Sequence, residues 1–230
     1  MNYKIIQDAQ ALNDFIDWLP DLQENEKYFV ALFARKKYCD HLIKSNDKTQ
    51  LKRFTSTKDR LFEKIMQLEC KIGSYTLRNI IAPQESLVLY INPNPRHMKK
   101  ATFGLIKKCV ELLQTGNAYN IHAEALSCIQ RSKSKSYFCD FDIDDNDADL
   151  DKLTAILPKH TYNTLVTKNG YHILVNVAQA PKSKWHLAIR NTFNVDQVGD
   201  QLMPVPGCTQ GGFVPHFMQK LEKLEKYEKR

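Results

Sequence analysis

The sequence predicts an α+β fold in which a mixed or antiparallel sheet is flanked by helices. Short β-type runs alternate with segments of helical periodicity along the 230 residues. An Asn-Gly pair between two β-type runs predicts an antiparallel hairpin. No internal repeat or low-complexity linker divides the chain, whose length suffices for one large domain or two small ones.

The first part of the chain is expected to contain two helices and two strands. Residues 8–19 predict a short helix, and residues 28–34 (YFVALFA) form a short apolar run typical of a buried strand. A second helix is expected to begin near residue 57, where apolar residues recur at helical spacing. Residues 86–91 predict the next strand, because the Asn-Pro-Asn-Pro sequence that follows stops it.

Two further helices are expected before the most informative segment. The first spans residues 99–113 and carries Phe103, Ile106, Val110 and Leu113 at helical spacing, so this stripe is predicted to face the core. A helix over residues 121–129 then leads into an acidic strand.

The clearest local signal is a hairpin in the second half of the chain. Residues 161–167 and 171–177 are β-type runs separated by an Asn-Gly pair, which predicts a two-residue type I′ turn. A helix is expected near residues 183–192, and short strands and turns in the Pro- and Gly-rich residues 202–216. Residues 220–230 are expected to form a charged helical tail.

Acidic and apolar residues alternate between residues 136 and 145 (SYFCDFDIDD). Successive side chains of a strand point to opposite faces, so Asp140, Asp142 and Asp144 share one face. Carboxylates crowded on one face repel one another, and a divalent cation offsets that cost. Mg²⁺ binds one or two carboxylates and completes its shell with water and phosphate oxygens. The alternation therefore predicts a catalytic metal site.

Two other interpretations of this segment stay open. The strand end could be solvated and lead into a helix over residues 146–157, whose acidic first turn suits the helix dipole. A calcium loop would take its ligands from the same aspartates together with Asp151. Such a loop needs Gly at its sixth position and Glu at its twelfth, where this sequence has Asp145 and Asp151.

The charge distribution favours a phosphate-bearing partner. The formal net charge is +7, which is compatible with binding to nucleic acid. Basic residues cluster in residues 96–100 and 131–135, and acidic residues in 140–151. A carboxylate site flanked by basic segments suits a phosphate substrate together with a metal ion.

Membrane, secreted and zinc-binding classes are not expected. No apolar run approaches the roughly 18 residues of a membrane span, and the first residues (MNYKIIQD) lack the features of a signal peptide. A cytoplasmic location without membrane association is the expectation. The six cysteines form no C-x-x-C pair, and Cys39 and His41 lack a second pair at zinc-site spacing, so no structural zinc is expected.

Three segments occur in an order that resembles the catalytic core of the archaeo-eukaryotic primase superfamily, which includes the primase-polymerases. Residues 137–142 (YFCDFD) match its strand of three apolar residues followed by Asp, an apolar residue and Asp. Residues 167–172 (TKNGYH) are similar to its small residue, short turn and histidine on a hairpin strand. Asp200, with Asp196 as a second candidate, precedes a Pro-Gly pair as the third acidic residue of that family does.

The resemblance covers about residues 86–216 and implies both an architecture and an activity. It implies an RRM-like sheet in a catalytic core at residues 81–218, preceded by an N-terminal α/β lobe (1–80) and followed by the tail (219–230). The implied activity is that of a DNA primase or polymerase, a nucleotidyltransferase that joins nucleoside triphosphates on a single-stranded DNA template. A separate helicase or replication protein would act with it, in a bacterial, phage or plasmid context.

The resemblance also implies roles for particular residues. Asp140, Asp142 and Asp200 would hold two divalent ions, Mg²⁺ or Mn²⁺, and His172 would contact the phosphates of the incoming nucleotide. The family often has a basic residue two places before Pro-Gly, where this chain has Pro204. The candidates to supply that charge for nucleotide binding are Arg96, Arg131 and Lys168, together with His172.

Two other functions stay open on the sequence alone. A metal-dependent nuclease uses a similar set of carboxylates. A catalytically degenerate primase fold would instead bind nucleic acid as an accessory protein, and the absence of a basic residue at Pro204 favours that function.

Overall fold

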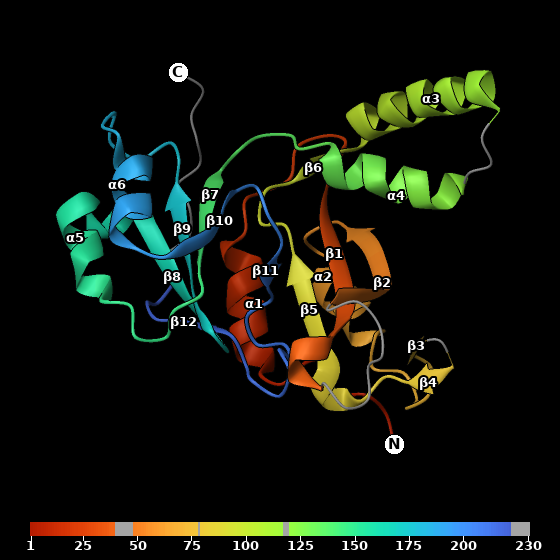
Figure 1. Ribbon diagram of the computed structural model, residues 1–230, viewed down its shortest axis with the longest axis horizontal. Helices are drawn as coiled ribbons and strands as arrows, with labels where there is room; N and C mark the ends of the chain where they lie inside the picture. Colours follow the sequence, from red (N-terminus) through yellow and green to blue (C-terminus); the bar gives the residue numbers. More distant parts are fainter. Residues whose placement is uncertain (40–47, 78, 117–119, 222–230) are drawn as a thin grey trace.

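The computed structural model describes the chain except for residues 40–47, 78, 117–119 and 222–230. The described residues form helices, two five-stranded antiparallel sheets and a two-stranded hairpin (Figure 1). The α+β prediction is confirmed. The charged tail predicted for residues 220–230 falls almost wholly outside the described residues.

The first sheet combines strands from both ends of the chain. Its order is β11-β5-β1-β2, and β6 also pairs with β1. The strands are β1 (Glu26–Arg35), β2 (Lys48–Ser56), β5 (Leu87–Ile91), β6 (Arg96–His97) and β11 (Met203–Pro204). Since β1 pairs with β5 from Val30↔Ile91 to Ala34↔Leu87, the boundary expected near residue 81 runs through a single sheet. The first 80 residues therefore share this sheet with the rest of the chain.

The second sheet has the order β10-β7-β9-β8-β12. Its strands are β7 (Phe138–Ile143), β8 (Tyr162–Thr167), β9 (Gly170–Asn176), β10 (Val195–Gly199) and β12 (His216–Phe217). Two helices connect them, α5 (Leu153–Ile156) between β7 and β8 and α6 (Trp185–Thr192) between β9 and β10. This β-α-β-β-α-β path, with its first strand between the fourth and the third, is the ferredoxin-like arrangement of RRM sheets. The RRM-like sheet expected from the resemblance is present.

The two faces of the second sheet are covered differently. The helix α1 (Ala9–Trp18) lies between the two sheets (Figure 1), and its Trp18 ring stacks on Phe138 of β7 with ring centroids 4.6 Å apart. The helices α5 and α6 cover the opposite face, where Phe141 and Ile143 are fully buried. The alternation of β7 therefore places Cys139, Phe141 and Ile143 under α5 and α6, and Phe138 and the aspartates on the side of α1.

The remaining elements follow the sequence pattern with a few exceptions. The helix predicted from residue 57 is α2 (Leu61–Met66), which buries Leu61 and Ile65. The small hairpin β3 (Thr76–Leu77) and β4 (Ile80–Ile81) and the edge strand β2 were not predicted. None of the described helices is both long and apolar enough to span a membrane.

The helix predicted over residues 146–157 is much shorter than expected. A 3₁₀ turn (Leu150–Lys152) and the single turn of α5 replace it. The Asp145 carboxylate accepts a hydrogen bond from the Asp147 amide at 2.9 Å. Such a local side-chain bond stabilises a turn in place of the first helical turn.

The hairpin occurs at the predicted place, but its turn is shifted by one residue. Thr167 pairs with Gly170, so Lys168 and Asn169 form the turn and Gly170 opens β9. A type I′ turn needs positive φ at both turn residues, and among the described non-glycine residues only Asn25 and Asn79 have it. The type I′ prediction is wrong. Gly170 has φ +151°, and a Cβ atom there would lie 1.9 Å from the Ile143 carbonyl oxygen.

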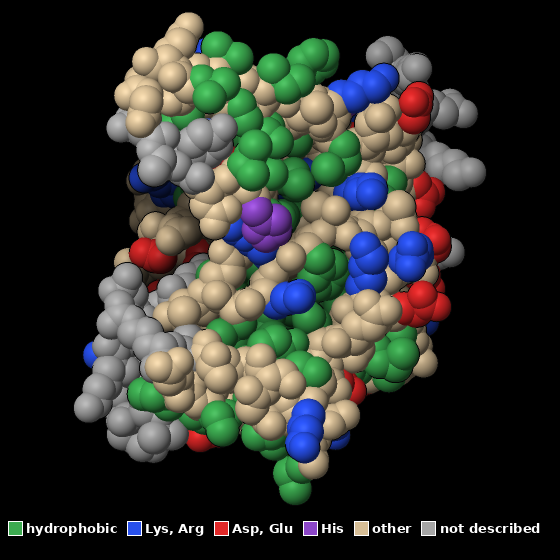
Figure 2. Space-filling model, turned by 90° about the vertical axis from the view of Figure 1, so that its right-hand side faces the viewer, with side chains coloured by type: hydrophobic (Ala, Val, Ile, Leu, Met, Phe, Trp, Pro, Cys, Tyr) green, Lys and Arg blue, Asp and Glu red, His purple; other side chains and the backbone are tan. Residues whose placement is uncertain are grey.

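The apolar stripe predicted to face the core is exposed instead. The helices α3 (Met98–Thr115) and α4 (Ile121–Arg131) form an arm that projects from the body (Figure 1). Phe103 is 71% and Leu113 is 74% exposed, and Ala101 is the only buried residue of α3. Figure 2 shows hydrophobic side chains along the upper part of the face that bears this arm. The stripe lies on the surface because α3 packs mainly against α4, with smaller contacts to β6, and does so through the face that bears Gly104.

Gly207, of the Pro-Gly pair, holds the N-terminus of α1. Its carbonyl oxygen accepts hydrogen bonds from the amides of Gln7 and Asp8, both at 2.9 Å. Its φ is +76°, and a Cβ atom would lie 2.4 Å from the Asp8 carbonyl oxygen. This close approach leaves no room for a side chain.

The substitution Gly207→Ala is therefore expected to lower the free energy of unfolding by about 3 kcal/mol, from left-handed backbone strain plus the clash. Gly212→Ala is the matched control, because Gly212 has φ +80° with no atom within 4 Å of a Cβ, so about 1 kcal/mol is expected. Urea denaturation of both variants checks the difference, and equal losses would contradict the proposed close packing.

Candidate active site

The strands β7 and β9 bring two of the predicted aspartates and the histidine together. In the antiparallel register Asp142 is directly paired with His172, and Asp140 with Leu174. Directly opposite residues have side chains on the same face of the sheet. The three side chains therefore gather on the side of the sheet that faces α1, although 32 residues separate Asp140 from His172 along the chain.

The His172 ring lies between the two carboxylates. Its Nδ1 atom is 3.0 Å from Oδ1 and 2.9 Å from Oδ2 of Asp140. Its Nε2 atom is 3.4 Å from Oδ1 of Asp142. The Asp140 side chain is 1% exposed and that of Asp142 is 25% exposed. Asp140 thus orients the ring from inside the protein, and Asp142 is the carboxylate that a ligand can reach.

The aspartates favour the protonated form of His172. Burial alone would lower the pKa of His172, but the charge and hydrogen bond of Asp140, with smaller effects of Asp142 and Asp144, outweigh it and raise this pKa above 6.5. The imidazolium form places one positive charge among several negative ones.

The carboxylates around Asp142 leave an excess of negative charge. Burial is the largest effect raising the pKa of Asp142 above 3.8; His172 opposes it, and Asp140, Asp144 and Asp196 add to it. A raised pKa means that the ionised carboxylate is destabilised where it stands. A divalent cation would relieve this excess, because carboxylate oxygens are preferred ligands of Mg²⁺ and Mn²⁺.

The contacts of His172 predict a pH dependence of stability. A histidine whose pKa is raised on folding contributes stability below its unfolded pKa, near 6.5, and loses it as the pH rises through the folded value. The wild-type protein is therefore expected to lose stability relative to His172→Gln as the pH rises above about 6.5 and through the raised pKa of His172. Urea midpoints across this range measure the difference, and a constant difference between the two proteins would contradict it.

Asp200, the predicted third metal ligand, has a different set of partners. Nη1 and Nη2 of Arg96 lie 2.6 Å and 3.1 Å from its two carboxylate oxygens, and Asn94 donates to it at 3.1 Å. The Arg96 side chain is 2% exposed. Over the described ranges, no three His, Cys, Asp or Glu side chains are grouped so as to hold a metal ion. Asp140 and Asp142 thus meet at His172, while Asp200 is held by Arg96.

Asn94 is a further residue of this site whose role was not predicted from the sequence. Its side-chain oxygen accepts the amides of Tyr137 and Phe138 at 2.8 and 2.9 Å, and its nitrogen donates to the Phe138 carbonyl at 2.9 Å. It thereby fixes the start of β7 and bridges it to Asp200. The Pro residues on either side of Asn94 mark a rigid turn, which is the only sequence signal for it.

The other two predicted basic residues, Lys168 and Arg131, form no hydrogen bond or ion pair with these aspartates among the described residues. Lys168, in the hairpin turn, donates from Nζ to the Gly211 carbonyl and lies 4.5 Å from the centre of the Tyr38 ring. Arg131 is at the end of α4 and lines a groove between α3 and α4. The structure therefore gathers Asp140, Asp142 and His172, and places these two cations elsewhere.

The fold and the site define a ferredoxin-like sheet that carries paired carboxylates and an imidazole on its inner face. Comparisons with protein-family models, curated proteins and solved structures find no match for this chain. A function for this chain is therefore inferred from the chemistry of the site.

Proposed function

We propose that this chain is a metal-dependent nucleotidyltransferase of the primase-polymerase type, which joins nucleoside triphosphates on a single-stranded DNA template. The observation that carries the proposal is the position of His172 between Asp140 and Asp142. The ferredoxin-like order of the strands that carry these residues supports the same proposal. The resemblance to the primase superfamily requires both features, and each is formed by segments that lie far apart in the sequence.

The two strand aspartates fit a magnesium or manganese ion. Mg²⁺ in proteins is commonly bound by one or two carboxylates, with water and substrate phosphates in the other positions. Asp140 and Asp142 are the ligands in this proposal, and the destabilised ionised form of Asp142 supports the need of that carboxylate for a cation. Asp200 and Asp196 are the two candidates for a third carboxylate.

The residues of the chain have separate tasks in the proposed reaction. When bound, the ion would stabilise charge on the phosphoryl oxygens and lower the pKa of the attacking hydroxyl. The buried Asp140 holds the ring of His172 and favours its protonated form. The imidazolium can then donate from Nε2 to a phosphate oxygen of the triphosphate, a charge-assisted hydrogen bond. Asp142, which is partly exposed, is the more accessible of the two proposed ligands.

The direct test is nucleotide incorporation by the purified protein. A labelled primer on a single-stranded template is incubated with deoxynucleoside or ribonucleoside triphosphates and Mg²⁺ or Mn²⁺, with and without chelator. Extension that requires the metal is the expected result. No extension under any of these conditions would overturn the proposal, and template degradation without triphosphate would assign a nuclease instead.

A second candidate is an accessory protein that binds nucleic acid without catalysis. The position of the missing basic residue favours it, because Pro204 lies in β11 of the first sheet, buried and paired with Tyr90. Template binding with no metal-dependent incorporation would support this candidate. A separate helicase or replication protein remains the proposed partner in either case.

A further inference from the structure

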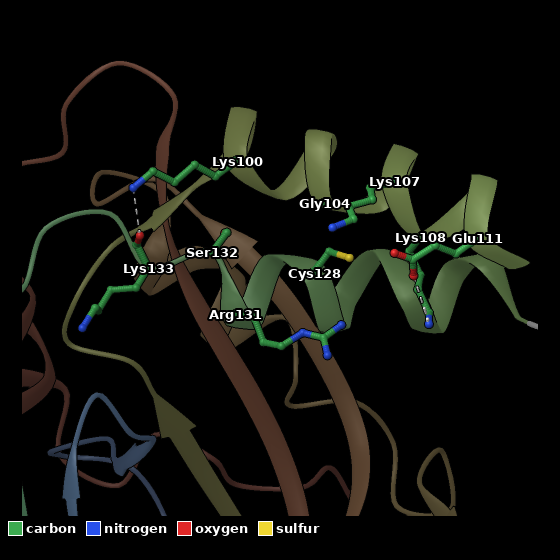
Figure 3. A pocket seen from close by; sticks show the side chains of 9 residues that line it. All are labelled: Lys100, Gly104, Lys107, Lys108, Glu111, Cys128, Arg131, Ser132 and Lys133. Carbon is green, nitrogen blue, oxygen red and sulfur yellow. Dashed lines mark hydrogen bonds and ion pairs between the residues drawn. The ribbon is translucent and has the colours of Figure 1, made fainter.

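A basic groove lies between α3 and α4, on a part of the fold separate from the paired aspartates (Figure 3). Its volume is about 360 Å³. The charged residues that line it are Lys100, Lys107, Lys108, Glu111, Arg131 and Lys133. Five of these six side chains are cationic, so the groove concentrates positive charge.

The positive charge of the groove is largely uncompensated. Lys108 forms an ion pair with Glu111 at 3.7 Å. Within the described part of the chain, no carboxylate forms an ion pair with Lys100, Lys107, Arg131 or Lys133. These four side chains belong to exposed residues on both helices and on the segment that follows α4. Lys100 donates from Nζ to the Lys133 carbonyl at 3.4 Å, a bond that leaves its charge in place. A groove whose four cations no carboxylate neutralises attracts a polyanion at close range.

An exposed aromatic ring borders this groove. Phe103 is 71% exposed, and on the helix it is a neighbour of Lys100 three residues before it and of Lys107 four residues after it. Single-stranded nucleic acids are bound by basic grooves that follow the phosphates and by aromatic rings on which bases stack. The combination distinguishes this surface from an ordinary solvated basic face.

The groove is continuous with the segment that enters the candidate active site. Lys133 forms a β-bridge with Arg96, and the Ser132 carbonyl accepts the His97 amide at 2.7 Å. The same segment continues into β7, which carries Asp140 and Asp142. A strand held in the groove would therefore be anchored at the beginning of the segment that leads to the aspartates.

We propose that the groove between α3 and α4 binds single-stranded nucleic acid. Phosphates lie against Lys100, Lys107, Arg131 and Lys133, and a base stacks on Phe103. This inference rests on the proposed function only where it names the bound strand as the template. The binding itself requires neither metal ion nor triphosphate.

The test is fluorescence anisotropy with a labelled oligothymidylate of about 20 nucleotides, without metal or triphosphate, from about 50 to about 200 mM salt. The double variant Lys107→Ala/Arg131→Ala is expected to bind at least tenfold more weakly at low salt. Its salt slope should fall in magnitude by about 1.4, because each phosphate contact to a single strand contributes about 0.7. Lys182→Ala/Lys184→Ala, before α6, is the matched control and should bind like wild type.

The variant Phe103→Ala tests the stacking contact separately. It is expected to lower affinity about tenfold without changing the salt slope. Leu113→Ala, at a residue 74% exposed on the same helix, should leave affinity unchanged. Because these side chains are exposed, far-ultraviolet circular dichroism should show wild-type folding in all variants.

The outcomes separate the groove from the proposed activity. Wild-type affinity and salt slope in the double variant would overturn the groove proposal. The proposal would also be overturned if polyglutamate displaced the labelled DNA as effectively as unlabelled DNA does. If the protein binds DNA through the groove but incorporates no nucleotide, the groove proposal is supported and the polymerase function is rejected.

Discussion

Substitution of Asp142 by Asn is expected to lower the rate of metal-dependent nucleotide incorporation by about 10³-fold or more, which corresponds to roughly 4 kcal/mol of transition-state stabilisation. The amide keeps the size of the side chain but removes the negative charge that a divalent ion needs. Asp140→Asn is expected to have an effect of the same order, because it also removes the group that orients and charges His172. Primer extension under single-turnover conditions measures both rates.

The stability of Asp142→Asn separates a catalytic role from a structural one. Because the pKa of Asp142 is raised in the folded protein, its ionised form opposes folding near neutral pH. The neutral amide should therefore leave the free energy of unfolding unchanged or slightly higher at pH 7. A large loss of incorporation without loss of stability is the expected combination, and a variant that loses both together would contradict the assignment.

Asp144→Asn is the matched control for the two strand aspartates. Asp144 continues the alternation of acidic and apolar residues, but it is exposed and lies just beyond the end of β7. Its substitution should change the rate by less than about tenfold, since it acts on the site only through longer-range charge. If Asp144→Asn were as inactive as Asp142→Asn, the acidic cluster would act as a whole and the paired-ligand proposal would be wrong.

The faces of β7 were predictable because the side-chain period of a strand is fixed by its backbone. The alternation of acidic and apolar residues placed Phe141 and Ile143 opposite the aspartates, and the structure buries them under α5 and α6. Placing His172 required the correct register as well, because a slip of one residue would move it to the other face. The Asn-Gly pair located the hairpin of β8 and β9, but the pairing of β7 with β9, which puts His172 opposite Asp142, lies outside what a local turn signal defines.

Gly170, the glycine of this pair, is required by a steric constraint that local turn rules do not consider. Gly170 lies in β9 and approaches the Ile143 carbonyl so closely that no Cβ atom fits. The constraint comes from the end of β7, 27 positions earlier along the chain (170 − 143). A local turn rule therefore found the hairpin while misplacing its turn by one residue.

Two other features could not be read from the sequence for a related reason. Helical periodicity shows that α3 has an apolar face, but it does not show whether anything packs on that face. Likewise, a single Asp before a Pro-Gly pair does not reveal that a buried arginine 104 residues earlier holds it. Both depend on contacts between segments distant in the chain.

Asp200→Ala is expected to lower the free energy of unfolding by about 3 kcal/mol, since it leaves the guanidinium of Arg96 buried without its carboxylate. Arg96→Met should cost less, because Asp200 has a side chain 17% exposed that water can partly solvate. The double variant should be more stable than Asp200→Ala alone, with a coupling energy of about 1–3 kcal/mol. Urea unfolding of the four proteins completes this cycle.

Metal binding decides between the structural and the catalytic role of Asp200. If Asp200 is the partner of Arg96, Asp200→Asn should keep the Mn²⁺ affinity of the wild type while it loses stability, and Asp196→Asn should lower that affinity. Calorimetric titration with Mn²⁺ measures both variants. If Asp200→Asn instead kept the stability of the wild type and lost Mn²⁺ binding, Asp200 would be the third ligand. Arg96 would then have to release Asp200 on metal binding, because its guanidinium occupies both oxygens of that carboxylate.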